Sequence, residues 1–167
     1  EARISRDKEH LRWVTIIDPG YATCFAVMFA VYNPYTAEVF ILDEIYSTDR
    51  DKNSVHNIWP EVERKQKSLY GGRWRNVYDC AALGFANEVK ARWGKHIQLI
   101  PTVKSPDDED AYFRLMNSGF ATDRFFIADR CVMTIFEMEN YETDEHDDYP
   151  DESNHQLDNF RYLLKSQ

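Results

Sequence analysis

The sequence predicts an α/β fold with a central mixed β-sheet flanked by helices. Apolar segments with strand character come first, at 13–18, 24–32 and 38–46, and only short turns separate them. Short turns require neighbouring strands to be antiparallel, because parallel neighbours need long crossover connections. The chain then alternates between helical and strand-like segments, which is typical of α/β domains. We therefore expect an antiparallel three-stranded meander followed by parallel strands.

Further helices and strands are expected after this meander. The helices are predicted at 52–69, 82–93, 107–117, 131–140 and 154–164, and the strands at 74–79, 97–103 and 124–128. Pro60 should kink the first helix or make it start late. Gly94 is predicted to end the second helix, and Ser118-Gly119 the third.

Length and composition indicate one globular domain. The chain has 167 residues, of which 43% are hydrophobic, and this is enough apolar material for a core. Residues 1–12 are charged and weakly patterned, so we expect a linker or N-terminal tail there and the folded domain at 13–167. Because the first residue is not methionine, we expect a piece of a longer protein. No segment has the roughly 20 apolar residues that span a bilayer, and no signal-peptide pattern is present.

The cysteines and the charge distribution bear on compartment and partner. Cys24, Cys80 and Cys131 are widely spaced without a CxxC pair, which favours reduced thiols in a cytoplasmic setting, and we expect Cys24 and Cys80 to be buried. The formal charge is −9, but seven of the acids lie at 141–152. Without those seven acids the formal charge of the remaining chain is −2. A DNA partner is therefore not excluded, although we expect this domain alone to bind DNA weakly.

Three aspartates lie where the predicted fold would direct them to a common point. Asp18 ends the first strand, Asp79 ends the strand at 74–79, and Asp158 lies on the last helix. A right-handed crossover would make these two strands parallel neighbours, and sites in open α/β sheets lie at such carboxyl ends. Carboxylates that converge repel one another unless a cation, a proton or hydrogen bonds compensate them. Divalent metal held by carboxylates points to phosphate chemistry.

Each of these residues also has an ordinary structural explanation. Asp18 precedes a Pro-Gly turn that it could cap, and Asp79 could cap the helix that follows it. Asp158 could pair with Arg161, three residues later on the same helical face. His155 shares that face and could be a surface or packing histidine. The functional interpretation therefore rests on the joint placement of the aspartates.

Two segments resemble signatures of the nuclease domain of bacteriophage large terminases. They are Ile-Ile-Asp-Pro-Gly-Tyr-Ala at 16–22 and Asn-His-Gln-Leu-Asp-Asn-Phe-Arg-Tyr at 154–162. The segment Val-Tyr-Asp-Cys-Ala-Ala at 77–82 is similar to the second acidic strand end of that family. The order of elements also matches, so the resemblance covers 13–164.

The resemblance implies an RNase H-like (RuvC-like) fold and a metal-dependent endonuclease that cuts concatemeric double-stranded viral DNA during packaging. Asp18, Asp79 and Asp158 match the acidic triad that holds the metal, and His155 matches an additional metal-site or catalytic position. The cofactor would be Mg²⁺ or Mn²⁺, as two ions about 4 Å apart that activate a water and stabilise the departing 3′ oxygen. No base-reading element is evident, so we expect little sequence specificity.

The resemblance also implies partners and a setting. The ATPase motor domain of a terminase would lie outside this chain, which contains no GxxxxGK[ST]. Further expected partners are the small terminase subunit and the portal, in the host cytoplasm during virion assembly, with no membrane contact and no secretion. The isolated domain is expected to be a monomer.

Other candidate residues and other functions stay open at this point. Lys104, Arg73 and Arg75 are candidate DNA contacts, and Asp43 and Glu44 are expected to be solvated acids at a strand end. The acidic segment 141–152 is either a solvated loop or a restraint that repels DNA. Alternative functions are another RNase H-like nuclease, such as a resolvase or transposase core, and an RNase H-like interaction module without catalysis.

Overall fold

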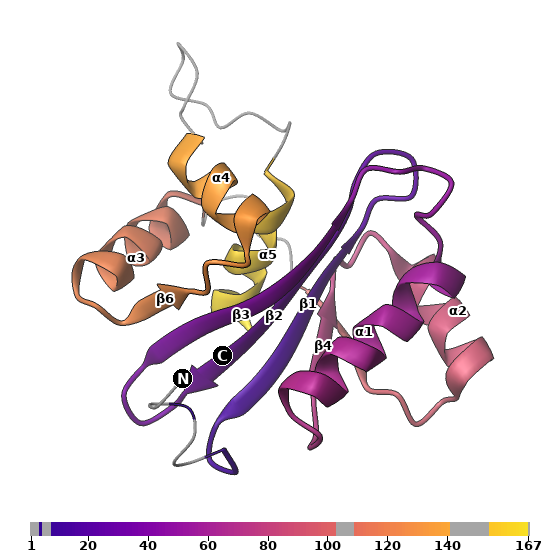
Figure 1. The fold of residues 1–167 in the computed structure, drawn as a ribbon, viewed down its shortest axis with the longest axis horizontal. Helices are drawn as coiled ribbons and strands as arrows, with labels where there is room; N and C mark the ends of the chain where they lie inside the picture. Colours follow the sequence, from indigo (N-terminus) through magenta and orange to yellow (C-terminus); the bar gives the residue numbers. More distant parts are fainter. Residues whose placement is uncertain (1–3, 5–7, 103–108, 141–153, 167) are drawn as a thin grey trace.

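A mixed six-stranded sheet forms the centre of the molecule, with helices on both faces (Figure 1). The structure is a computed structural model, and it describes residues 4, 8–102, 109–140 and 154–166. The strands are β1 Arg12–Pro19, β2 Phe25–Asn33, β3 Glu38–Ser47, β4 Arg75–Tyr78, β5 Leu99–Pro101 and β6 Phe125–Ile127. The helices are α1 Val55–Leu69, α2 Leu83–Trp93, α3 Glu109–Ala121, α4 Val132–Asn140 and α5 His155–Lys165.

The strand order is β5-β4-β1-β2-β3-β6, which confirms the predicted meander with parallel strands added to it. β2 is antiparallel to both β1 and β3, whereas β4 pairs with β1, β5 with β4 and β6 with β3 in parallel. The sequence-based expectation that the fourth strand lies beside the first is therefore correct. This order makes β1 central, because both a hairpin and a crossover connect to it.

Alternating side chains along β1 divide the core into two layers. Ile17 packs with α1 and α2 on one face of the sheet, and Ile16 packs with the layer of α3, α4 and α5 on the other. Because the alternation continues to the end of the strand, Asp18 lies on the same face as Val14 and Ile16. That is the face that α5 covers, since α5 packs on β1 and β2.

Three expectations about helix boundaries can be compared with the structure. α1 begins late, at Val55, where the Ser54 hydroxyl accepts a hydrogen bond from the Asn57 N–H, and Pro60 lies inside the helix. α3 does not end at Ser118-Gly119 but continues to Ala121. Gly119 is there for packing, because a Cβ at this position would collide with the ring of Phe125. Gly94 does end α2, in a positive-φ conformation that favours glycine.

The burial of the cysteines agrees only in part with the expectation. Cys24 and Cys131 are buried free thiols, but Cys80 is exposed, contrary to the expectation for it. Cys80 follows the end of β4 in a turn, so the buried environment of the strand does not extend to it. In the described part of the chain, no helix is long and apolar enough to cross a membrane.

Candidate functional site

Asp18 and His155 form the closest contact of the candidate site. Oδ2 of Asp18, at the end of β1, lies 2.8 Å from Nδ1 of His155, the first residue of α5. Both side chains are largely shielded, with 18% and 23% of their surface exposed. The hydrogen bond to Asp18 raises the pKa of His155, against the opposing effect of burial. Nδ1 of His155 is therefore engaged with the Asp18 carboxylate, and its Nε2 has no partner among the described residues.

Asp79 lies next to Asp18 because of the parallel pairing of β1 with β4. Its N–H donates to the carbonyl of Ile17 at 3.0 Å, which extends the ladder one residue beyond β4. Its Oδ1 accepts the Ala81 N–H at 2.9 Å, so Asp79 also makes a local contact in the turn that precedes α2. Its Oδ2 accepts the Tyr162 hydroxyl of α5 at 3.4 Å. Asp79 is thus tied to both the sheet and α5.

Asp158 lies in the first turn of α5, between His155, which contacts Asp18, and Tyr162, which contacts Asp79. Its carboxylate is 2.7 Å from Nη2 of Arg161, which is the structural pairing considered from the sequence. Its negative charge also raises the pKa of His155, and it adds to the raised pKa of the buried Tyr162. Asp158 therefore acts electrostatically on the α5 residues that contact Asp18 and Asp79. All three predicted aspartates face the same layer.

The three aspartates are near one another without forming a ready set of ligands. Over residues 8–102, 109–140 and 154–166, no three His, Cys, Asp or Glu side chains are grouped so as to hold a metal ion. Their donor chemistry nevertheless suits a hard cation, since all of them offer carboxylate oxygens. Oδ1 of Asp18 has no hydrogen-bond partner in the described chain. A metal would have to compete with His155 for the other oxygen of Asp18, and with Arg161 for Asp158.

Glu137 is a buried acid beside this site that the sequence analysis did not single out. Only 2% of this residue, which lies on α4, is exposed. Its Oε2 accepts the N–H groups of Gln156 and Leu157 at 2.7 and 3.0 Å, which are unpaired donors at the start of α5. Burial raises its pKa to about 7, although these N–H groups favour the charged form. The one signal in the sequence is an acid within the helix periodicity of 131–140, three residues after Thr134.

Glu44 and Asp43 are also engaged, and the expectation that they are solvated is wrong. Glu44 accepts the N–H groups of Met133 and Thr134 at 2.7 and 3.0 Å, so it holds the start of α4. Asp43 points to the other face of β3 and pairs with Lys65 of α1 at 2.7 Å. Each acid anchors a helix on the sheet.

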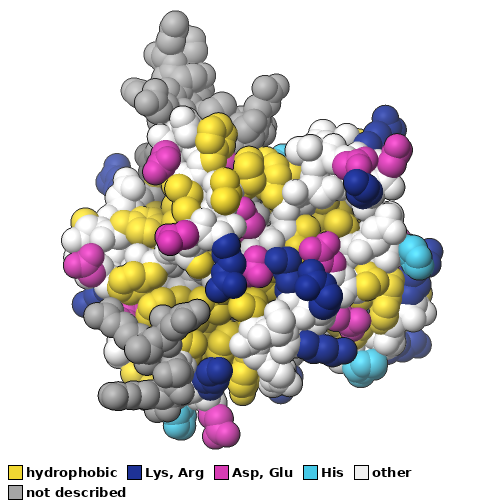
Figure 2. All heavy atoms as spheres, in the orientation of Figure 1, with side chains coloured by type: hydrophobic (Ala, Val, Ile, Leu, Met, Phe, Trp, Pro, Cys, Tyr) yellow, Lys and Arg dark blue, Asp and Glu magenta, His cyan; other side chains and the backbone are white. Residues whose placement is uncertain are grey.

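The candidate DNA-contact residues lie away from the aspartates or outside the described chain. Lys104 and the acidic segment 141–152 are outside the described residues. Arg75 begins β4 and Arg73 precedes it, so both lie at the end of the sheet opposite to Asp79. On the face in view, Figure 2 shows Lys and Arg side chains near the middle with Asp and Glu around them. That face carries mixed charge.

Comparisons with known structures show the fold. The large terminase of a thermophilic bacteriophage is 16% identical, with a TM-score of 0.75 over 92% of this chain and 39% of that one. The nuclease domain of the SPP1 large terminase g2p, solved with bound Mn, is 21% identical, with a TM-score of 0.72 over 99% of this chain and 90% of that one. The P22 large terminase nuclease domain is 13% identical, with a TM-score of 0.76 over 95% and 82%.

This chain therefore has the RNase H-like fold of large terminase nuclease domains, as the resemblance implied. It spans about two fifths of the large terminase from the thermophilic phage, 39% of that chain. No protein-family model matches the sequence, and no curated protein matches it.

Proposed function

We propose that this chain, which has the fold of terminase nuclease domains, is the metal-dependent endonuclease domain of a viral DNA-packaging terminase. The observation that carries the proposal is the placement of Asp18 and Asp79 at adjacent strand ends beneath α5. His155 and Asp158 of that helix complete a set of acids and one histidine on a single face of the sheet. The SPP1 relative holds Mn, which supports a divalent metal here.

Asp18, Asp79 and Asp158 are proposed to hold Mg²⁺ or Mn²⁺, two ions in the full site. The metal would lower the pKa of an attacking water and stabilise the departing oxygen of a phosphodiester. Asp18 holds Nδ1 of His155, so the imidazole presents Nε2 as the atom that takes or gives a proton. The carboxylate of Asp18 is shared between these two tasks. His155 is therefore proposed as a catalytic residue that depends on Asp18.

The substrate and setting follow from the terminase proposal. Double-stranded concatemeric DNA would be cut with little sequence preference. The ATPase domain would belong to the same polypeptide outside this chain, with residues 1–12 as linker to the domain at 13–167. The small terminase subunit and the portal would be partners in the host cytoplasm, and the isolated domain would be a monomer.

Nicking of supercoiled plasmid by the 167-residue chain tests the activity. We expect nicking in Mn²⁺ or Mg²⁺ and none after chelation. Asp18→Asn should lower the rate by about two orders of magnitude or more, because a metal ligand becomes a neutral amide. Asp129→Asn is the matched control, because Asp129 is an exposed acid between β6 and α4. Equal nicking by both variants would contradict the proposed site, and no nicking by the parent chain would favour an inactive RNase H-like module.

A further inference from the structure

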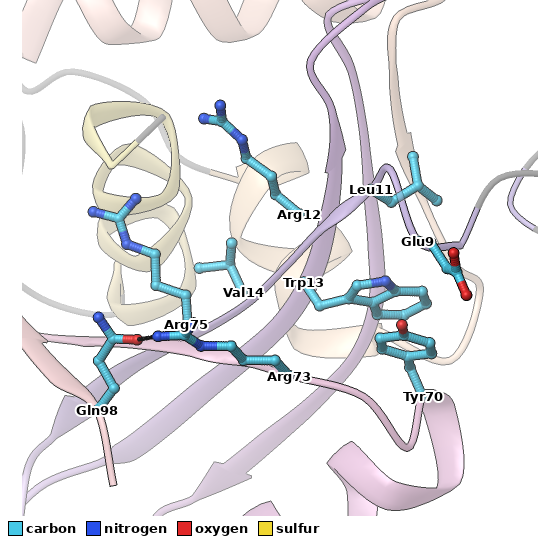
Figure 3. Close-up of a pocket in the computed structure, with 9 residues that line it drawn as sticks. All are labelled: Glu9, Leu11, Arg12, Trp13, Val14, Tyr70, Arg73, Arg75 and Gln98. Atoms are coloured by element: carbon cyan, nitrogen blue, oxygen red, sulfur yellow. Dashed lines mark hydrogen bonds between the residues drawn. The ribbon is translucent and has the colours of Figure 1, made fainter. Parts of the chain in front are cut away.

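A cavity of about 350 Å³ lies at the end of the sheet opposite to the aspartates. Arg12 of β1, Arg75 at the start of β4 and Arg73 just before it line one side (Figure 3). The other side is formed by the rings of Trp13 and Tyr70, which stack with centroids 4.5 Å apart. We call the three arginines and the space between them the arginine pocket. It lies where the chain enters β1.

Among the described residues, no carboxylate forms an ion pair with any of the three guanidinium groups of the arginine pocket. Arg75 donates to the carbonyl of Ser166 at 2.7 Å and Arg73 to the side-chain oxygen of Gln98 at 2.8 Å, and both acceptors are uncharged. The lining residue Glu9 lies on the side of the two rings, away from the guanidinium groups (Figure 3). Three arginines therefore line one pocket in a chain of net charge −9.

Unsatisfied donors remain in the arginine pocket. A guanidinium has five N–H donors in a planar fork, and each of Arg73 and Arg75 makes one described hydrogen bond. Nε of Arg75 is buried without an acceptor among the described residues. Planar forks of this kind match the oxygens of a phosphate better than any uncharged ligand does. The chemistry of the pocket therefore calls for an anion with several oxygens.

The arginine pocket and the aspartates lie at the two ends of one helix. Arg12 has the same strand parity as Val14, and Arg75 is the register partner of Val14, so both lie on the face that α5 covers. His155 at the start of α5 contacts Asp18, and Ser166 just after its end contacts Arg75. A helix of 11 residues is about 16 Å long. One DNA strand rises about 3.4 Å per nucleotide, so this length corresponds to about five nucleotides.

We propose that the arginine pocket binds a backbone phosphate of the duplex about five nucleotides from the cleaved bond. The inference rests on the proposed nuclease function, because it places the scissile phosphate at Asp18 and Asp79. A repeating polyanion can reach both ends of α5 at once, which a single small anion cannot. The pocket would orient the duplex along α5 without reading its sequence.

Salt-dependent binding of a labelled duplex without divalent metal tests the arginine pocket. The double variant Arg12→Gln/Arg73→Gln removes two charges and leaves the Arg75 contact to Ser166 in place. Its matched control is Arg64→Gln/Arg92→Gln, which removes two charges from α1 and α2 on the opposite face of the sheet. We expect the pocket variant to bind roughly tenfold more weakly or worse, with a salt slope shallower by about 2, and the control to change little. Thermal unfolding of both variants verifies that they fold.

The outcomes separate this inference from the proposed function. Equal affinity and equal salt slopes for the pocket and control variants would overturn the inference. Plasmid nicking by the parent chain is measured in parallel. If the parent nicks DNA and the pocket variant binds DNA as well as the parent does, only the inference about the arginine pocket is wrong. If the parent does not nick DNA, the nuclease proposal is wrong.

Discussion

Two carboxylates hold the first turns of helices in this protein, and one of them positions the candidate site. Glu44 accepts N–H groups at the start of α4, and Glu137 does so at the start of α5. Negative charge at a helix N-terminus is favoured both by these unpaired donors and by the helix dipole. Since His155 directly precedes the two residues that Glu137 binds, Glu137 fixes the turn that brings His155 to 2.8 Å from Asp18.

The raised pKa of Glu137 predicts a pH-dependent loss of stability. Its ordinary value is 4.5 and its value in the fold is about 7, so the unfolded chain releases this proton first. Protonated Glu137 therefore makes its full contribution to the free energy of unfolding below pH 4.5, and this contribution is lost as the pH rises through 7. Glu137→Gln keeps an oxygen for the Gln156 and Leu157 N–H groups and cannot ionise. Across this pH range, we expect the free energy of unfolding of the parent to fall by about 2–3 kcal/mol more than that of Glu137→Gln.

Urea unfolding of parent and variant below pH 4.5 and above pH 7 measures this effect. Glu139→Gln is the control, because Glu139 is an exposed acid on the same helix. The parent and the control should lose stability in parallel across the range, while Glu137→Gln loses less. A variant that follows the parent curve would show that Glu137 does not carry the proton.

At the scale of elements, a glycine inside α3 allows this helix to approach β6. Gly119 was predicted to end the helix, yet α3 continues past it to Ala121. Its Cα faces the ring of Phe125, whose side chain packs in turn on Phe120 and on Phe160 of α5. The absence of a side chain at 119 thus joins α3, β6 and α5 in one layer.

Two glycine-to-alanine substitutions separate packing from helix propensity. Gly119→Ala should lower the free energy of unfolding by about 1–3 kcal/mol, because its Cβ would collide with the Phe125 ring. Gly84→Ala on α2 meets nothing within 4 Å and should instead raise it by about 0.5–1 kcal/mol. Chemical denaturation of both variants gives the two signs. A stabilising effect of Gly119→Ala would contradict the packing explanation.

At the scale of the whole molecule, the sequence predicts what general rules of strand and helix arrangement specify. Strand alternation and right-handed crossovers are such rules, and they are sufficient to place Asp18 beside Asp79 under a final amphipathic helix. The caps by Glu44 and Glu137 join residues 90 and 19 positions apart, and no local rule specifies such pairs. The arginine pocket likewise needs the register of β1 with β4, and the sequence alone left Arg73 and Arg75 without a location. The roles of the three aspartates stay predictions.

Metal binding can be tested on the stability of the whole fold, apart from catalysis. A cation that binds the folded chain alone stabilises it by about 2.7 kcal/mol at a hundred times its dissociation constant. In a domain of this size we expect Mn²⁺ to raise the midpoint of thermal unfolding by about 5–10 °C, and chelation to reverse the rise.

Variants assign that stabilisation to residues. Asp18→Asn should lose most of the rise, because Asp18 is a proposed metal ligand, while Asp129→Asn should keep it. His155→Gln separates two effects. It removes the imidazole that now contacts Oδ2 of Asp18, so the variant should bind Mn²⁺ at least as well as the parent and yet nick DNA more slowly. If Asp18→Asn shows the full rise, the cation binds elsewhere on this acidic chain, and the proposed ligand set is wrong.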